Sequence, residues 1–312
     1  MSRIGHFPSR QDGVAVITAL LLATLAITIV ASLFWQQQVQ IRSIENQRAQ
    51  LQKQWILRGA LEWAGLILRE DARFSATDNL GEPWAVPLAE TALDQYVEFT
   101  RSDGGEGGVM LSGWMTDAQG RFNLTNLCPD GTINPREVEV FARLLANLRL
   151  NPALASAAAQ AMAAAKSKAA DIPDAAPAQI GFAYVDDLLA VPGFTPETVR
   201  ALKDFVVVLP GPTPINVNTA PVEVIAARME SASSGTAAAI VASRQQAYFR
   251  DVSDFLHRFP DRQLAASPDA VSVRTDYFIV NGRVRLDQTA LDVVALVRRS
   301  GADAKVVWAR DM

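Results

Sequence analysis

The chain has 312 residues, of which 49% are hydrophobic, 20% are charged and 7% are aromatic. This composition is typical of a globular protein large enough for two modest domains, and it excludes a wholly disordered chain. The 29 basic and 33 acidic residues are spread along the sequence, so no basic surface for nucleic acid is indicated. With two histidines and one cysteine, Cys128, the chain has no Cys/His zinc site, no intramolecular disulfide and little basis for a histidine-centred triad.

An apolar run without a charge extends from Val14 to Trp35. At the rise of an α-helix it reaches about 33 Å, the thickness of the hydrocarbon core of a bilayer. Its hydroxyl residues can return hydrogen bonds to the preceding helical turn; they are Thr18, Thr24, Thr28 and Ser32. A cleavable signal peptide has a shorter apolar stretch of about 7 to 15 residues. The run therefore predicts a transmembrane helix.

The charges that flank this run predict its orientation. Arg3 and Arg10 precede it, and the first charge after it is Arg42. The positive-inside rule then leaves the short amino end in the cytoplasm and the bulk of the chain on the far side of the membrane. The sequence continues without proline, with apolar residues at helical spacing. We expect one long helix over residues 14–72, of which 14–35 spans the membrane.

Short runs with the alternation of β-strands occur on both sides of a helical block. The first runs are DQYVEF, GVMLSGWM and GRFNLTNL, and the last are SVRTDYFIV, RVRL, LDVVALVRR and KVVWAR. Asn281 and Gly282 predict a two-residue hairpin turn. Between these strands, Asn134, Thr195 and Thr219 precede proline-containing helix starts and are predicted to cap them.

This order predicts an α+β fold in which a long amino-terminal helix packs on a small antiparallel sheet. A large all-helical insertion, residues 133–268, opens that sheet. Residues 73–132 would form its first part, and residues 269–312 the carboxy-terminal strands that complete it.

Three features that suggest chemistry have simpler structural interpretations. The glycine cluster at 104–108 lacks the Lys and Ser/Thr of a nucleotide loop, which favours a hairpin tip. Asp186 and Asp187 are adjacent, so a capping role is favoured over an acid and base pair. His257 lies at the carboxyl end of a predicted helix, where a histidine side chain interacts favourably with the helix dipole. We therefore predict no catalytic residues.

A membrane-anchored DNA-binding protein is an alternative, because VPGF and INVNTAP with their flanking helices resemble helix-hairpin-helix units. Such units hold phosphate with the backbone amides of a Gly-x-Gly turn and nearby cations. Here Gly193 is followed by Phe194, and only Arg200 and Lys203 lie close in sequence. The same helices are favoured as a scaffold that contacts protein, and no nucleic acid partner is predicted.

The start RQDGVAVITALLL resembles a type IV prepilin leader, in which glycine directly precedes the apolar helix. The resemblance implies a leader of residues 1–13, cleavage by prepilin peptidase after Gly13, and methylation of Val14 as the new amino terminus. Most pilins have glutamate at the fifth mature position, whereas this chain has Thr18. Within the pilin-like proteins this absence is typical of the minor pseudopilin K family of type II secretion. NLGEPWA, GRFNLTNL, VPGF, INVNTAP and VRTDYFIV resemble segments of that family in the same order.

This resemblance implies a single-pass protein of the bacterial inner membrane, with its bulk in the periplasm, that acts at the tip of the pseudopilus without catalysing a reaction. It would help to initiate assembly and the export of folded periplasmic proteins. The implied partners are the minor pseudopilins I, J and H, the inner-membrane assembly platform and prepilin peptidase. A minor pilin of a type IV pilus or competence system is the alternative.

Calcium is implied by the family resemblance alone, because members of the family can hold it in the helical domain. In the corresponding segment of this chain the carboxylates are Asp171 and Asp174. We assign no metal ligands and no cofactor.

Overall fold

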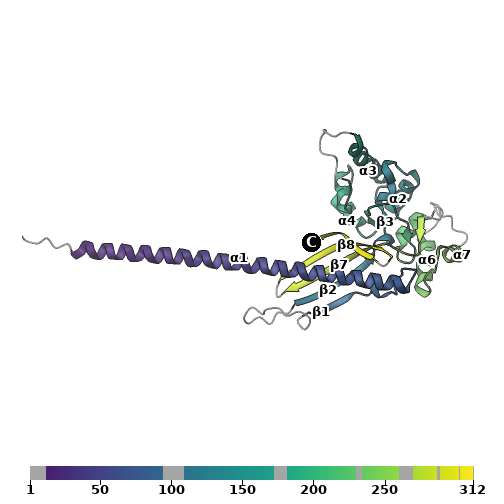
Figure 1. Ribbon diagram of the computed structural model, residues 1–312. Helices are drawn as coiled ribbons and strands as arrows, with labels where there is room; N and C mark the ends of the chain where they lie inside the picture. Colours follow the sequence, from purple (N-terminus) through teal and green to yellow (C-terminus); the bar gives the residue numbers. More distant parts are fainter. Residues whose placement is uncertain are drawn as a thin grey trace, which may run out of the picture. The chain divides into compact units, whose positions relative to one another are not determined.

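The computed structural model describes residues 12–93, 109–171, 181–229, 234–259, 270–286, 289–301 and 303–311. The chain forms two compact units, Met1–Ile56 and Leu57–Met312. Helix α1, Asp12–Phe74, begins in the first unit and ends in the second (Figure 1). This confirms the long amino-terminal helix predicted from the sequence. The helix is uninterrupted because the segment contains no proline.

The second unit is built around an antiparallel sheet of five strands in the order β1-β2-β7-β8-β9 (Figure 1). The strands are β1 Leu88–Ala92, β2 Val109–Asp117, β7 Tyr277–Leu286, β8 Thr289–Ser300 and β9 Asp303–Asp311. β2 and β7 are direct neighbours in the sheet, although the helical block separates them in sequence. The predicted opening of one antiparallel sheet by a helical insertion is therefore confirmed.

The predicted hairpin turn at Asn281 and Gly282 is wrong, because both residues lie inside β7. Gly282 pairs with Gly113 of β2. A Cβ on Gly113 would lie 2.5 Å from the carbonyl oxygen of Asn281, and one on Gly282 would lie 3.5 Å from Leu57 of α1. Gly113 thus allows the close approach of the neighbouring strand, and Gly282 that of the helix, which is a common reason for glycine inside a strand.

GRFNLTNL does not join the main sheet, contrary to the sequence prediction. Its strand residues form β3, Phe122–Asn123, which pairs in parallel with β4, Val206–Val207. A second short parallel pair joins β5, Ile215–Asn216, to β6, Val271–Ser272. The predicted strand DQYVEF and the glycine cluster 104–108 lie outside the described residues.

The insertion between β2 and β7 contains α2 Pro135–Asn147, α3 Leu154–Asp171, α4 Pro196–Leu202, α5 Val222–Arg228, α6 Ser234–Gln246 and α7 Val252–Arg258. Short 3-10 turns are η1 Pro83–Ala85, η2 Ala118–Gly120, η3 Leu124–Leu127, η4 Pro129–Gly131 and η5 Val185–Ala190. Asn134 and Thr195 cap α2 and α4 as predicted. Thr219 does not cap α5, which begins after Pro221.

Alternation along β7 separates two apolar layers on the sheet. Phe278 and Val280 face α1, where they pack with Ala64, Leu68, Trp84 and Val297. Tyr277 and Ile279 face the other side and pack with Val207 and Leu209 of the insertion. The insertion also has a larger core of its own, in which Phe122 stacks on Phe141 at 5.3 Å. The sheet thus lies between the carboxy-terminal part of α1 and the insertion.

Candidate functional site

The amino-terminal unit contains a segment that is long and apolar enough to cross a membrane. Val16–Ile44 has a mean hydropathy of 2.5, and none of its strongest window is buried. The hydroxyls of Thr24 and Thr28 donate to the carbonyls of Leu20 and Thr24, at 3.0 and 2.6 Å, as the sequence predicted. Bonds of this kind satisfy hydroxyl side chains in helices that cross a membrane.

The predicted processing site lies in the first turns of α1, which begins at Asp12. Gly13 and Val14 are therefore helical, while the leader residues before Asp12 lie outside the described part of the chain. Thr18 is on the same helix and is exposed. Cleavage after Gly13 stays a prediction.

The buried carboxyl group of Asp78 connects three parts of the second unit. It accepts from the guanidinium of Arg299 on β8 and from the backbone N–H of Thr275, the latter at 2.7 Å. Its backbone carbonyl accepts from Nδ2 of Asn216 at 3.0 Å. Asp78 thus connects the sheet, the segment that precedes β7 and the insertion.

Two more carboxyl groups complete this cluster. Arg299 Nη1 donates to Asp71 of α1 at 2.9 Å. Asp117, at the end of β2, accepts from Asn216 Nδ2 at 2.8 Å and from the hydroxyl of Thr219 at 2.6 Å. We call Asp71, Asp78, Asp117, Asn216 and Arg299 the Asp78 node.

Burial dominates the electrostatics of the Asp78 node, because a charged carboxylate loses hydration there. It raises the pKa of Asp71 to about 6, with repulsion from Glu82 and Asp78 adding to the effect and Arg299 opposing it. Burial also raises the pKa of Asp117 to about 6, against hydrogen bonds that favour the ionised form. The pKa of Asp78 is raised as well, since burial outweighs the attraction of Arg299.

Asp71, Asp78 and Glu82 bring carboxyl oxygens within 4.8 Å of one another, an arrangement that can hold a cation. Here Arg299 donates to the two aspartates. Glu82 accepts from Asn79 and from the indole N–H of Trp84, the latter at 2.8 Å. These carboxylates have partners within the chain, and we assign no metal ligand among them.

The calcium prediction concerned another segment. The side chains of Asp171 and Asp174 lie outside the described residues.

A second contact between insertion and sheet is aromatic and ionic. Tyr184 meets Trp308 of β9 edge to face, at 5.1 Å between ring centroids. The guanidinium of Arg310 lies over both rings, at 5.0 and 5.8 Å. Asp186 pairs with Arg310 at 3.3 Å and with Lys203 at 2.8 Å.

The adjacent aspartates therefore serve separate structural roles. Asp187 accepts from the backbone N–H groups of Ala183 and Tyr184, at 2.7 and 2.8 Å, which confirms its capping role. Asp186 is held by two cations, and the hydrogen bond from Lys203 lowers its pKa. His257 lies in the last turn of α7, as predicted.

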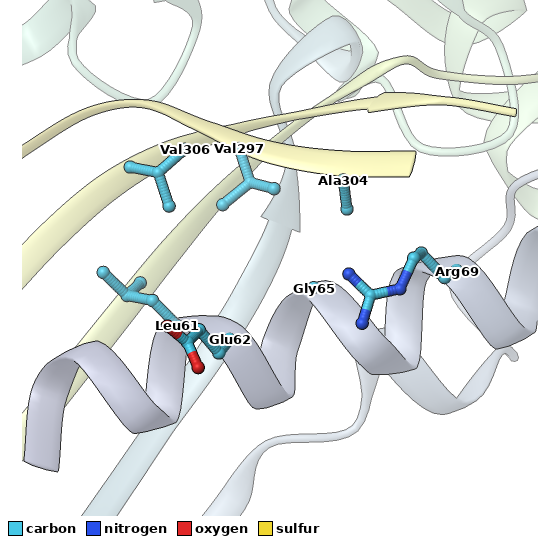
Figure 2. A pocket seen from close by; sticks show the side chains of 7 residues that line it. All are labelled: Leu61, Glu62, Gly65, Arg69, Val297, Ala304 and Val306. Atoms are coloured by element: carbon cyan, nitrogen blue, oxygen red, sulfur yellow. The ribbon is translucent and has the colours of Figure 1, made fainter. Parts of the chain in front are cut away.

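A cleft of about 370 Å³ lies between α1 and the strands β8 and β9 (Figure 2). Its lining residues are Leu61, Glu62, Gly65, Arg69, Val297, Ala304 and Val306. Figure 2 shows the valines of the strands facing Leu61 of the helix across it. Glu62 is the one carboxylate among these residues, so the lining of the cleft offers no pair of carboxyl groups for acid and base catalysis.

The turn that resembles a helix-hairpin-helix unit is built for packing within the chain. Gly193 has a φ of +95°, and Thr195 caps the helix that follows. Lys203, one of the cations near this turn, is paired with Asp186. The chain has a second turn in the corresponding place after Ile225, MESASSG at 229–235, and residues 230–233 of it lie outside the described part of the chain.

Comparisons with known proteins agree with this architecture. Two family models described as "Type II secretion system (T2SS), protein K" match residues 120–211 and 215–274. Protein K of Pseudomonas aeruginosa is 32% identical, with 97% of this chain and 93% of that protein covered. Protein K of Pectobacterium carotovorum subsp. carotovorum is 25% identical, with 96% of each chain covered.

The fold has a relative among solved structures. A chain in the crystal structure of the GspK-GspI-GspJ complex of enterotoxigenic Escherichia coli superposes with a TM-score of 0.66. It is 19% identical, and the match covers 86% of this chain and 98% of that one. Together with the identity to the Pseudomonas protein over nearly the whole length, these findings show that the chain belongs to the type II secretion system protein K family, a family of minor pseudopilins.

Proposed function

We propose that this protein is the minor pseudopilin at the tip of a type II secretion pseudopilus. There it helps to initiate assembly and the export of folded periplasmic proteins. The observation that carries the proposal is the 32% identity to protein K of Pseudomonas aeruginosa over 97% of the chain. The apolar segment Val16–Ile44 and the helical insertion in the sheet agree with it.

Thr18, in place of the usual pilin glutamate, supports a position of this subunit at the tip of the pseudopilus. A carboxylate within the hydrocarbon core costs about 2.5 to 3.5 kcal/mol on insertion scales, and pilin-like subunits offset it by pairing with a neighbouring amino terminus. A subunit with no neighbour above it has no such partner. A neutral hydroxyl residue at this position avoids the cost.

Maturation would remove residues 1–13 by cleavage after Gly13, followed by methylation of Val14. The apolar helix stays in the mature chain because cleavage falls before it. The charges at Arg3 and Arg10 support a cleavage site on the cytoplasmic side, with the bulk of the chain in the periplasm.

The proposed partners are the minor pseudopilins I and J, with H nearby, and the assembly platform and prepilin peptidase of the inner membrane. The solved relative is a complex with GspI and GspJ. Exchange of lipid for neighbouring apolar helices around Val16–Ile44 involves little change in hydrophobic burial. The role is structural, without catalysis or nucleic acid binding. Calcium in the insertion is a further prediction from the family alone.

Deletion of the gene in its host tests this role. Loss of the protein should leave exported substrates in the periplasm, and a plasmid copy should restore their secretion. The full chain, purified in mild detergent, should bring down the minor pseudopilins I and J. Recovery of pilus or competence components in their place, with secretion unaffected by the deletion, would establish the type IV minor pilin alternative.

A further inference from the structure

The insertion covers one end of the sheet face that it meets. Ile279 of β7 lies on this face and is buried with Val207 and Leu209 of the insertion. Two residues further along β7, on the same face, Asn281 pairs with Trp114 of β2. Trp114 is 53% exposed. The cover by the insertion therefore ends between Ile279 and Asn281.

An uncovered surface begins at Trp114 and continues along the same face. Ser112 of β2 pairs with Arg283 of β7, which in turn pairs with Asp292 of β8. The guanidinium of Arg283 donates to both carboxylate oxygens of Asp292, at 2.5 and 2.7 Å. We call Ser112, Trp114, Asn281, Arg283 and Asp292 the Trp114 surface.

The charges of the Trp114 surface and of its border cancel in pairs. Arg283 is compensated by Asp292. Arg285, the next residue of β7 on this face, pairs with Glu90 of β1 at 2.7 Å. The surface therefore offers an ionic ligand no excess of either charge.

The neutral polar groups of the Trp114 surface are available for hydrogen bonds. Within the described part of the chain, the side-chain amide of Asn281 and the hydroxyl of Ser112 bond to no other residue. Nη1 of Arg283 takes no part in the pair with Asp292. These donors and acceptors surround the one exposed indole ring.

An apolar protein surface would suit this composition badly. Among the described residues of β2, β7 and β8, Trp114 is the one large hydrophobic residue that is exposed. Docking of an apolar partner would bury the polar groups of Ser112 and Asn281 without partners, which costs free energy. The fitting ligand is uncharged, carries many hydroxyl groups and has one apolar face.

We propose that the Trp114 surface binds an uncharged stretch of polysaccharide, the N-acetylated glycan strand of the cell wall. The C–H face of a sugar ring stacks on the indole of Trp114, as flat apolar groups do on aromatic rings. Asn281 lies directly opposite, with about 5 Å between Cβ atoms in such pairs, so its amide bonds to the edge of the stacked sugar. The choice of the cell wall as source rests on the proposed location of the bulk of the chain in the periplasm.

The pair of Arg283 and Asp292 extends this site by one sugar along the strand. The two side chains hold each other in place through two hydrogen bonds. Little side-chain freedom is then lost when hydroxyl groups bind to them.

Fluorine NMR of the full chain in detergent, with 5-fluorotryptophan in place of tryptophan, tests the binding. Trp114→Phe assigns the resonance of Trp114. Titration with the β-1,4-linked tetramer of N-acetylglucosamine should shift this resonance in a saturable manner and leave that of Trp63 unchanged. Asn281→Ala should weaken the affinity about fivefold, the effect of one lost hydrogen bond.

Sedimentation of the purified full chain with cell-wall sacculi tests the source. Wild type should be retained, and Trp114→Ala should be lost from the pellet. Trp63→Ala is the matched control, since it removes a tryptophan of α1 that is 47% exposed, and it should be retained like wild type. Circular dichroism verifies that each variant is folded.

A Trp114 resonance that is constant up to saturating tetramer, or equal retention of the two tryptophan variants, would overturn the proposal. A shift of this resonance by the minor pseudopilins I and J alone would do so as well, because it would identify a protein interface. Secretion by the host is a separate measurement, so failure of glycan binding leaves the proposed function standing.

Discussion

Arg299 of β8 donates to Asp71, in the last turns of α1, across 2.9 Å, and each side chain is 5% exposed. The sheet thereby places a cation at the carboxyl end of the long helix, where the helix dipole is negative. The same guanidinium lies 4.8 Å from the ring centroid of Phe278 and bonds to Asp78. One strand residue therefore connects the end of α1 to the loop that contacts the insertion.

Replacement of this arginine should strongly destabilise the fold. Arg299→Met would leave Asp71 and Asp78 buried without their cation, a change that costs about 3 to 5 kcal/mol in comparable sites. Arg283→Met on β7 is the control, since Arg283 pairs with Asp292 at the surface, where a pair contributes about 1 kcal/mol or less. Urea unfolding of the full chain in detergent, followed by tryptophan fluorescence, measures both. Equal losses in the two variants would contradict the importance of the node.

The stability of the protein should fall as the pH rises through about 6. A carboxyl group whose pKa is higher in the folded state than in the unfolded state binds its proton more tightly in the folded state. Its stabilising contribution is therefore complete at a pH below the pKa of the unfolded state and is lost at a pH above the pKa of the folded state. For Asp117, with a pKa raised from 3.8 to about 6, the loss is on the order of 2 to 3 kcal/mol.

Urea midpoints measured from about pH 4 to about pH 8 should show this decline, because they cover the interval between the two pKa values. Asp117→Asn should flatten the profile. Asp292→Asn is the control, since the hydrogen bond from Arg283 lowers the pKa of Asp292 and places its titration below this interval. A wild-type midpoint that rises with pH over the same range would be the opposite of the expected sign.

Gly113 should tolerate no side chain, whereas Gly59 should. A Cβ at Gly113 would lie 2.5 Å from the carbonyl oxygen of Asn281 on the neighbouring strand, so Gly113→Ala should cost about 1 to 3 kcal/mol. Gly59 lies in α1 with no atom within 4 Å of such a Cβ, and alanine there should stabilise by about 0.5 to 1 kcal/mol. Thermal unfolding midpoints of the two variants should move in opposite directions.

Features that depend on nearby residues could be predicted from the sequence. The long helix follows from an uninterrupted apolar and helical pattern, and Asn134 and Thr195 cap helices because their hydroxyl or amide oxygens reach N–H groups two or three residues on. The order of strands, helices and strands also predicts the opened sheet. In each case the partner is close in sequence or the order of elements limits the topology.

Features that depend on distant partners could not be predicted. Asn281 and Gly282 have the composition of a hairpin turn, but the pairing with Gly113 and the contact with Leu57 decide their conformation. Thr219 looks like a helix cap, yet its hydroxyl donates to Asp117, which is 102 residues away. Local propensity is outweighed in both places by contacts that only the folded chain brings together.

The Asp78 node was missed for the same reason, since Arg299 lies 221 residues from Asp78 and Asn216 lies 99 residues from Asp117. A signal was present in INVNTAP, because asparagine side chains among apolar residues must find hydrogen-bond partners once buried. Asn218 shows the same behaviour, as its side chain donates to and accepts from the backbone of Phe249.

Processing at the predicted site can be tested with two leader glycines. If prepilin peptidase cleaves after Gly13, the mature chain begins at Val14, with a methylated amino group, and intact mass spectrometry should find it without its first 13 residues. Gly13→Val should abolish cleavage because the bulkier side chain lies at the scissile bond, and the leader should stay attached. Gly5→Val makes the same substitution eight positions earlier and should leave cleavage unaffected. A mature chain that begins after Trp35 would instead identify the apolar run as a removable signal sequence and would refute the anchored pseudopilin.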